Sequence, residues 1–216
     1  MEVYRIMRSP VVTVNPQTTL AEAWKIMKNL RIRHLPVISE GRLVGIVSDR
    51  DLRSASPAFW EENSEEKTCQ IWIGQIMSKN VITIAPDDTI DEAARIMYEF
   101  RIGSLPVVDG KYLVGLLTQS DILRALTELL GVHEPGSQLI LEIPDRPGVL
   151  ADIAIIFKNL GVNIVSVVTL PKRRHEEYRL MVIRVNTIDP RKIMAALQQA
   201  GYIVRTPRLE DTGYGR

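Results

Sequence analysis

The chain has 216 residues, of which 45% are hydrophobic and 25% are charged, and its net charge at pH 7 is +1. This length fits two or three domains, and this composition is that of an ordinary globular protein with enough apolar residues for its cores. The balanced charge argues against a nucleic-acid partner, and the lack of an uncharged apolar run of about 18 residues argues against a membrane helix. The lone Cys69 and the lack of a signal-peptide core predict a cytoplasmic protein.

The first half of the chain contains an internal repeat. Residues 6–55 return without a gap as residues 76–125, with 20 of 50 positions identical. Two copies of one unit usually pack about a pseudo-two-fold axis, so equivalent residues then face shared clefts.

Each copy predicts a β-α-β-β-α unit, because β-branched and apolar runs alternate with helical spacing. The elements expected in the first copy are a strand at 11–14, a helix from Leu20 capped by Thr19 and Glu22, strands at 35–38 and 43–47, and a helix opened by Ser48.

Two segments without this pattern interrupt the chain. Residues 56–75 are polar and acidic in the middle, which is typical of a surface excursion, and residues 131–137 contain Pro135-Gly136, which is typical of a linker. Residues 138–206 then hold no copy of the repeat, and their strands and helices follow the order βαββαβ, the ferredoxin-like motif. The overall fold class predicted is therefore α+β.

The spacing Gly-x-x-Ser/Thr-x-x-Asp occurs once in each copy, as Gly45, Ser48 and Asp51 and again with Thr118 and Asp121. The start of a helix offers free N–H groups to a phosphate, and a carboxylate one turn later can accept both hydroxyls of a ribose. The same spacing is also a capping box, which needs no ligand. From spacing alone the cap is the stronger interpretation.

Two further groups of residues could hold a charged ligand. Arg33 and His34 precede a strand and could face an anion between the copies, or they could lie in a solvated loop; the second copy has Gly103 and Ser104 instead. Asp145 opens a turn into a helix and, with Asn163, could hold the ammonium and carboxylate of an amino acid. By residue type Asp145 fits better as a helix cap.

Enzymatic chemistry has little support in the sequence. The three histidines lie in unrelated segments without metal-ligand spacing, Cys69 has no activating neighbour, and there is no P-loop or Gly-x-Ser-x-Gly elbow. We therefore expect no catalytic residue and no metal site.

The two copies resemble CBS domains, the cystathionine-β-synthase type repeat, through Leu-Pro-Val at 35–37 and 105–107 and through both Gly-x-x-Ser/Thr-x-x-Asp elements. Residues 145–150 and 161–164 resemble an ACT domain, and a CBS pair followed by an ACT domain is similar to proteins of acetoin utilization. The resemblance divides the chain into CBS repeat 1 (1–60), an inter-repeat segment (61–75), CBS repeat 2 (76–130), a linker (131–137), an ACT domain (138–207) and a flexible tail (208–216).

The resemblance to CBS pairs implies two clefts, each combining the hydroxyl and carboxylate of one repeat with the early strand of the other, and it favours the ligand site over the plain cap. One cleft would combine Ser48 and Asp51 with Met77, Asn80, Ile82, Ile102 and Gly103. The other would combine Thr118 and Asp121 with Met7, Pro10, Val12, Ile32 and Arg33, and Arg33 and His34 would reach phosphates. The resemblance to ACT domains implies amino-acid contacts from Asp145, Gly148, Val149, Leu150, Asn163 and Ile164.

The function implied is a non-catalytic sensor, a homodimer whose CBS pair binds AMP, ADP or ATP, with S-adenosylmethionine also fitting such sites. Energy sensing and a link to acetoin utilization would follow, and a regulated enzyme would be the partner. Two alternatives remain: a nucleotide-independent scaffold that docks a partner enzyme and dimerises through the ACT domain, and an enzyme of acetoin metabolism.

Overall fold

The computed structural model describes residues 1–55, 71–171 and 178–205. Most of the excursion expected at 56–75 and the tail expected at 208–216 lie outside this part. The chain divides into two compact units, Met1–Leu123 and Arg124–Arg216, with the division inside one helix. Among the described residues, no helix is long and apolar enough to cross a membrane.

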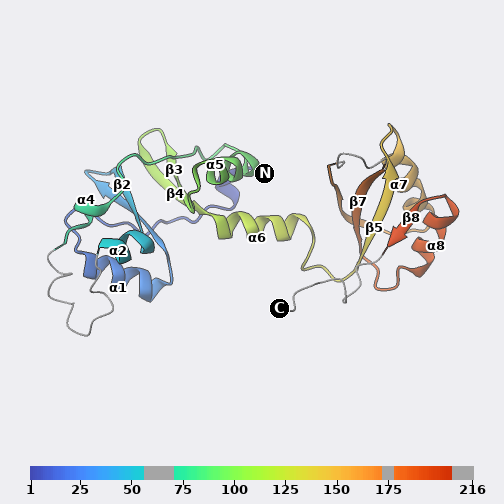
Figure 1. The fold of residues 1–216 in the computed structure, drawn as a ribbon, viewed down its shortest axis with the longest axis horizontal. Helices are drawn as coiled ribbons and strands as arrows, with labels where there is room; N and C mark the ends of the chain where they lie inside the picture. Colours follow the sequence, from blue (N-terminus) through green and yellow to red (C-terminus); the bar gives the residue numbers. More distant parts are fainter. Residues whose placement is uncertain (56–70, 172–177, 206–216) are drawn as a thin grey trace. The chain divides into compact units, whose positions relative to one another are not determined.

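The first repeat forms two helices and a hairpin, as the sequence predicts (Figure 1). Its first helix begins with the expected capping box, in which Glu22 N donates to Thr19 Oγ1 at 3.2 Å and Thr19 N donates to Glu22 Oε2 at 2.9 Å. The elements are a 3-10 turn η1 (Val3–Arg5), α1 (Leu20–Leu30), β1 (His34–Ser39), β2 (Arg42–Ser48) and α2 (Asp49–Ala55).

The strand expected at 11–14 is wrong in extent, since only Val14 pairs, in a parallel bridge with Val37. Val14 N donates to Pro36 O at 3.1 Å and Val14 O accepts from Ile38 N at 2.8 Å. Directly after this bridge, Asn15 turns the chain by accepting a hydrogen bond from Gln17 N at 2.9 Å. The β-branched run therefore has one partnered position, which is too little for a strand.

The second repeat copies this order within the described residues. Ile84 makes the parallel bridge to Val107 that Val14 makes to Val37. The elements are α4 (Ile73–Ile76), α5 (Ile90–Phe100), β3 (Ser104–Asp109), β4 (Tyr112–Thr118) and α6 (Gln119–Leu129).

The repeats exchange their leading segments. Arg8 pairs with Leu116 of β4 through two backbone hydrogen bonds of 2.9 and 3.1 Å, and Ser78 pairs with Ile46 of β2 through two of 2.9 and 3.0 Å. Ile73 is fully buried in the core of the first repeat. Each repeat is therefore completed by the chain that leads into the other, which brings the two hairpins together.

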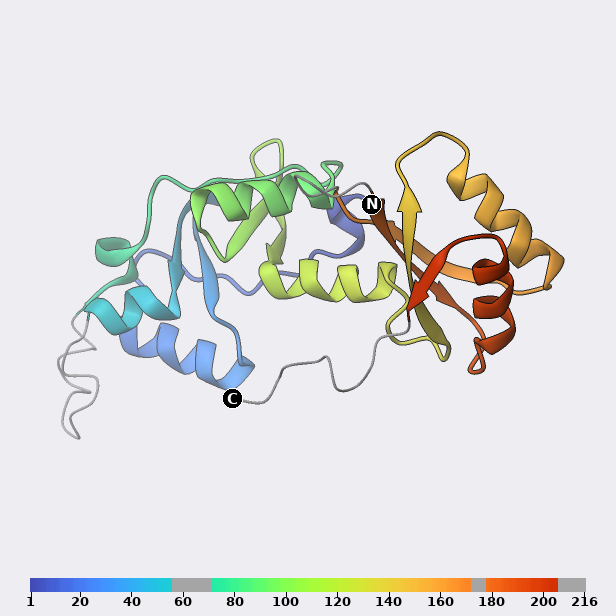
Figure 2. The ribbon, with the colours of Figure 1, turned by 45° about the vertical axis from the view of Figure 1, so that its right-hand side comes forward.

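The second unit is the predicted ferredoxin-like fold, with strand order β6-β7-β5-β8 and antiparallel neighbours. Its core lies between the sheet and two helices that cover the same face, gold and red in Figure 2. The elements are β5 (Ser137–Pro144), α7 (Val149–Asn159), β6 (Ile164–Thr169), β7 (Tyr178–Val185), α8 (Arg191–Gln199) and β8 (Ile203–Arg205).

The segment after α6 packs against this same sheet. Ser166 Oγ donates to Leu130 O at 3.0 Å, and Arg184 Nη2 donates to Val132 O at 3.3 Å and to Glu134 O at 3.2 Å. Three backbone carbonyls of the segment are thus held by side chains of β6 and β7.

Candidate functional site

The hydroxyl–carboxylate motif of the first repeat lies where β2 ends and α2 begins. Asp51 Oδ2 accepts hydrogen bonds from Ser48 N at 2.8 Å and Ser48 Oγ at 2.6 Å, and Asp51 N donates to Ser48 Oγ at 3.2 Å. The reciprocal cap is therefore real. It occupies one carboxylate oxygen, and within the described residues Oδ1 of the partly exposed Asp51 accepts no hydrogen bond.

The motif of the second repeat makes the same cap at the start of α6. Asp121 Oδ2 accepts from Thr118 N at 3.0 Å and Thr118 Oγ1 at 2.5 Å. Its other oxygen differs, because Arg8 Nε donates to Asp121 Oδ1 at 3.3 Å. The Asp121 side chain is only 2% exposed, so the two equivalent carboxylates lie in different surroundings.

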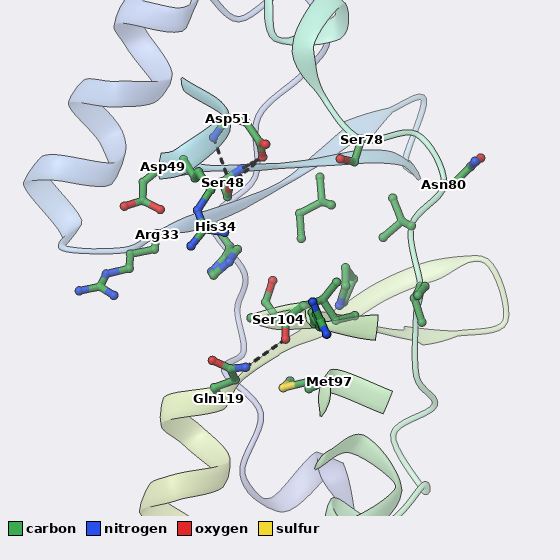
Figure 3. Close-up of a pocket in the computed structure, with 18 of the residues that line it drawn as sticks. Arg33, His34, Ser48, Asp49, Asp51, Ser78, Asn80, Met97, Ser104 and Gln119 are labelled. Atoms are coloured by element: carbon green, nitrogen blue, oxygen red, sulfur yellow. Dashed lines mark hydrogen bonds between the residues drawn. The ribbon is translucent and has the colours of Figure 1, made fainter. Parts of the chain in front are cut away.

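A cleft of about 970 Å³ opens at the first motif and takes side chains from both repeats (Figure 3). Its volume is at the upper end of the range of about 300–1,000 Å³ that small-molecule sites occupy. In the close-up, Ser48 and Asp51 lie across the cleft from Ser104 and Met97. The lining comprises Arg33, His34, Ile46, Ser48, Asp49, Arg50, Asp51, Ser78, Asn80, Val81, Ile82, Met97, Tyr98, Glu99, Arg101, Ile102, Gly103, Ser104, Pro106 and Gln119.

The cleft combines apolar and charged walls. Three guanidinium groups, from Arg33, Arg50 and Arg101, line it together with three carboxylates. Burial lowers the pKa of His34, which Asp49 and Asp51 partly offset, so its ring is neutral at pH 7 and donates or accepts hydrogen bonds without adding charge. Such a lining can hold a ligand with an apolar ring, hydroxyls and an anionic group.

The structure brings together the residues expected beside the first motif. Asn80, Ile82, Ile102 and Gly103 line the cleft with Ser48 and Asp51. Met77 does not line it. The Met77 side chain packs on Gly45, where an added Cβ would lie 2.5 Å from the Met77 sulfur.

Arg33, expected beside Thr118 and Asp121, instead lines the cleft of Ser48 and Asp51, and His34 lines it too. His34 lies so close to Gly103 that an added Cβ there would be 3.2 Å from the ring. The two copies of this segment therefore meet, and both Arg33 and His34 lie at the cleft of their own repeat.

Four of the residues expected beside Thr118 and Asp121, namely Met7, Pro10, Val12 and Ile32, do not line the cleft of Ser48 and Asp51, and their grouping around Asp121 stays a prediction. Met7 packs on Gly115 as Met77 does on Gly45, and Ile32 packs against the core of the first repeat. Pro10 and Val12 are both exposed.

The residues expected to hold an amino acid are split between opposite ends of the sheet in the C-terminal unit. Pro144 pairs with Tyr178 at one end of β7, whereas Ile164 pairs with Val185 at the other. Asp145 follows the first end and Asn163 precedes the second, because α7 returns the chain across the sheet before β6 begins. The expectation that Asn163 lies close to the Asp145 turn is therefore wrong within one chain.

The Asp145 turn is held by ion pairs. Asp145 Oδ1 lies 3.1 Å from Arg179 Nε, and Asp152 Oδ2 accepts from Arg146 Nη2 at 2.9 Å. The residue that caps the N-terminus of α7 is Gly148, at φ 87°, so Asp145 lies three residues before the cap position where it was expected. Of the remaining expected residues, Val149 is buried, Leu150 is exposed and Ile164 packs at the edge of the core.

Arg8, which contacts the carboxylate of the second motif, is the residue that sequence reasoning did not single out. Its equivalent in the second copy is Ser78, so a comparison of the copies could have shown the difference. In the described ranges, no group of three or more His, Cys, Asp or Glu side chains could hold a metal ion.

Comparison with known proteins supports these observations. The family model of the CBS domain matches residues 3–58 and 73–128, and that of the ACT domain matches residues 137–201. A CBS domain-containing protein of Dictyostelium discoideum is 37% identical over 141 residues, which are 62% of this chain and 97% of that protein. A homoserine O-acetyltransferase of Methanohalobium evestigatum is 36% identical over 57% of this chain, but this match spans only 24% of the enzyme.

Three solved structures share the fold. The CBS domain pair of protein MJ0100, in complex with 5′-methylthioadenosine and S-adenosyl-L-methionine, is 33% identical with a TM-score of 0.52, covering 59% of this chain and 97% of that one. CBSX2 in complex with AMP is 29% identical with a TM-score of 0.51, covering 59% and 96%.

The third is a protein from Vibrio cholerae that is named AcuB for acetoin utilization. It is 33% identical, with a TM-score of 0.53, and the match covers 62% of this chain and 95% of that one. The two matches to the CBS model coincide with the two repeats of the structure, and the match to the ACT model coincides with its ferredoxin-like unit. The chain therefore belongs to the CBS domain family, with a tandem CBS pair followed by a C-terminal ACT domain.

Proposed function

We propose that this chain is a non-catalytic regulatory protein whose CBS pair binds an adenine nucleotide, AMP, ADP or ATP, in the cleft of Ser48 and Asp51. One observation carries the proposal. Asp51 is fixed by its own cap through Oδ2, and its Oδ1, which accepts no hydrogen bond within the described residues, belongs to a side chain that lines a cleft of about 970 Å³ built by both repeats.

The lining supplies each contact that a nucleotide needs. Asp51 Oδ1 accepts the ribose hydroxyls, and the charged acceptor makes these hydrogen bonds stronger than neutral ones. Ile82 and Ile102 provide apolar contact for the two faces of adenine, and Arg33 with Arg101 provides donors for phosphate oxygens.

The ligands in related structures support an adenosine group in particular. Adenosine is common to AMP, 5′-methylthioadenosine and S-adenosylmethionine, the molecules held by CBSX2 and MJ0100. All three carry the same ribose hydroxyls. The three arginines of the lining can pair with a phosphate or with the carboxylate of S-adenosylmethionine, and the titration below compares these ligands.

Isothermal titration of AMP, ADP, ATP and S-adenosylmethionine tests the proposal. Replacing Asp51 by Ala removes a charged hydrogen-bond partner, so the affinity should fall roughly ten- to a hundred-fold, or about 1.5–3 kcal/mol. Asp109→Ala removes an exposed carboxylate from a hairpin of the same unit and should leave the affinity unchanged.

Because Asp51 also caps α2, its loss can weaken the fold, and Asp51→Asn controls for this. The amide keeps an acceptor for Ser48 and loses the charge, so a stable variant with weakened binding supports the ribose contact. Wild type that binds none of the four ligands contradicts the proposal.

The scaffold alternative has one observation in its favour, because the Ser48–Asp51 cap is complete without a ligand. Under that function, a partner enzyme binds equally well with and without nucleotide. Co-purification in charcoal-stripped lysate, repeated with added ATP, separates the two functions.

The regulatory role includes three finer proposals. We propose a homodimer, an amino acid as ligand of the ACT domain, and a link to acetoin utilization that rests on the similarity to AcuB of Vibrio cholerae. Since Asp145 and Asn163 lie at opposite ends of one sheet, an amino acid that touches both must bridge two chains. Reciprocal coupling between nucleotide and amino-acid affinities, seen by titration of each in the presence of the other, tests the regulation.

A further inference from the structure

The two carboxylates that could hold ribose differ in what faces them. Arg8 of the first repeat pairs with β4 beside the Thr118–Asp121 motif, and Ser78 of the second repeat pairs with β2 beside the Ser48–Asp51 motif. The two residues occupy equivalent positions of the repeat. Both are placed by the same pair of backbone hydrogen bonds to the neighbouring strand. The local backbone is therefore shared, and the difference lies in the side chain.

The Arg8 side chain reaches the carboxylate. Arg8 Nε donates to Asp121 Oδ1 at 3.3 Å, while Asp121 Oδ2 accepts from Thr118. Both oxygens of Asp121 are thus engaged, and its side chain is 2% exposed while that of Arg8 is 61% exposed. The nearly buried carboxylate is thus paired with a side chain that is itself mostly exposed.

Ser78 leaves the other carboxylate accessible. It lines the same cleft as Asp51, and a serine is too short to repeat the contact that Arg8 makes. The Asp51 side chain is partly exposed. A ligand that enters this cleft meets an oxygen that no described residue engages.

We propose that Arg8 closes the cleft of Thr118 and Asp121 to nucleotides, so that each chain binds one nucleotide, at Asp51. This inference rests on the proposed function and concerns which cleft works. A ribose at Asp121 would have to displace a guanidinium from a nearly buried carboxylate, whereas a ribose at Asp51 displaces no protein group. Arg8 is thereby a specificity-determining residue that acts through Asp121.

The repeat itself supplies the matched exchange for a test. Arg8→Ser gives the first repeat the residue of the second, and Ser78→Arg does the reverse. Titration of AMP, with ATP in parallel, should give one site per chain for wild type, two for Arg8→Ser and none for Ser78→Arg. The double exchange should bind one nucleotide, and its affinity should then fall at least ten-fold with Asp121→Ala and stay unchanged with Asp51→Ala.

Arg5→Ser is the control, because Arg5 makes an exposed ion pair with Glu2 at 2.7 Å and should leave one site per chain. Thermal unfolding of each variant checks its fold, and Ser78→Arg keeps the test decisive if Arg8→Ser does not fold. Two sites in wild type, one site in folded Arg8→Ser, or normal binding by folded Ser78→Arg would each overturn the inference while the proposed function stands. Absence of binding by every protein would overturn the proposed function, and the inference with it.

Discussion

The imidazole of His34 lies against the backbone of Gly103, so closely that a Cβ on residue 103 would be 3.2 Å from both Cε1 and Nε2 of the ring. The two residues belong to equivalent segments of the two repeats, offset by one position, and both line the cleft. The missing side chain of one repeat thus makes room for the ring of the other.

Gly103→Ala should therefore displace His34 within the cleft. The φ of Gly103 lies outside the left-handed region, so the backbone tolerates alanine and the fold should lose less than about 1 kcal/mol. We expect nucleotide affinity to fall several-fold in a titration, and His34→Ala to cancel the additional effect of Gly103→Ala in the double variant. Additive losses from the two changes would contradict direct contact.

His34 should make the stability of the first unit depend on pH near neutrality. Because burial lowers the pKa of His34 in the folded state below 6.5, the unfolded chain takes up a proton first as the pH falls. Stability should therefore decrease as the pH drops through 6.5 and level off below the folded pKa. Urea unfolding between pH 5 and 8 measures this slope.

His34→Gln should flatten that slope. The facing charged groups, Asp49, Asp51 and Arg33, stay in place, so the remaining pH dependence isolates the histidine. Carboxylates with a lowered pKa, such as Glu22 beside Thr19, act at lower pH, where protonation removes their contribution. An unchanged slope in His34→Gln would assign the effect to another group.

The equivalent helices α1 and α5 allow the contribution of a helix cap to stability to be measured by comparison. Thr19 accepts from Glu22 N in a complete capping box, whereas Thr89, at the equivalent position, makes no side-chain cap bond. Thr19→Ala should cost about 1 kcal/mol of unfolding free energy. Thr89→Ala should cost only a few tenths by the same urea measurement, and equal losses would show that the cap bond is not the cause.

Among the glycines of the C-terminal unit, Gly136 should be the one whose replacement by alanine destabilises the unit most. A Cβ there would lie 2.0 Å from Val185 O, and a backbone carbonyl in a central strand cannot move aside as a side chain can. Gly136→Ala should destabilise this unit by about 1–3 kcal/mol. Gly161→Ala is the comparison for backbone strain alone, since no atom lies within 4 Å of its added Cβ at φ 64°.

Local periodicity predicted much of the fold correctly. These features depend on residues that are only a few positions apart in the sequence: the apolar face of α1, its cap at Thr19, the hairpins and the βαββαβ order of the ACT domain. The strand at 11–14 was wrong because β propensity does not provide a partner, and only Val14 finds one.

The site was harder to predict because its contacts are long-range. Arg8 and Asp121 are separated by 113 residues, and only the pairing of Arg8 with Leu116 brings them together. The separation of Asp145 from Asn163 likewise depends on the direction of α7 across the sheet. Composition and spacing identified the chemical groups, and the tertiary fold decided which of them meet.

The exchange of leading segments bears on how such a pair arose. A single ancestral repeat would have carried the donor segment and the acceptor strand on the same chain, and two such chains could have completed each other as an intertwined dimer. Duplication and fusion of the gene would then have joined them without changing any contact. Once fused, the two halves were free to diverge, and a difference such as Arg8 against Ser78 changes the side chain beside one carboxylate without changing its twin.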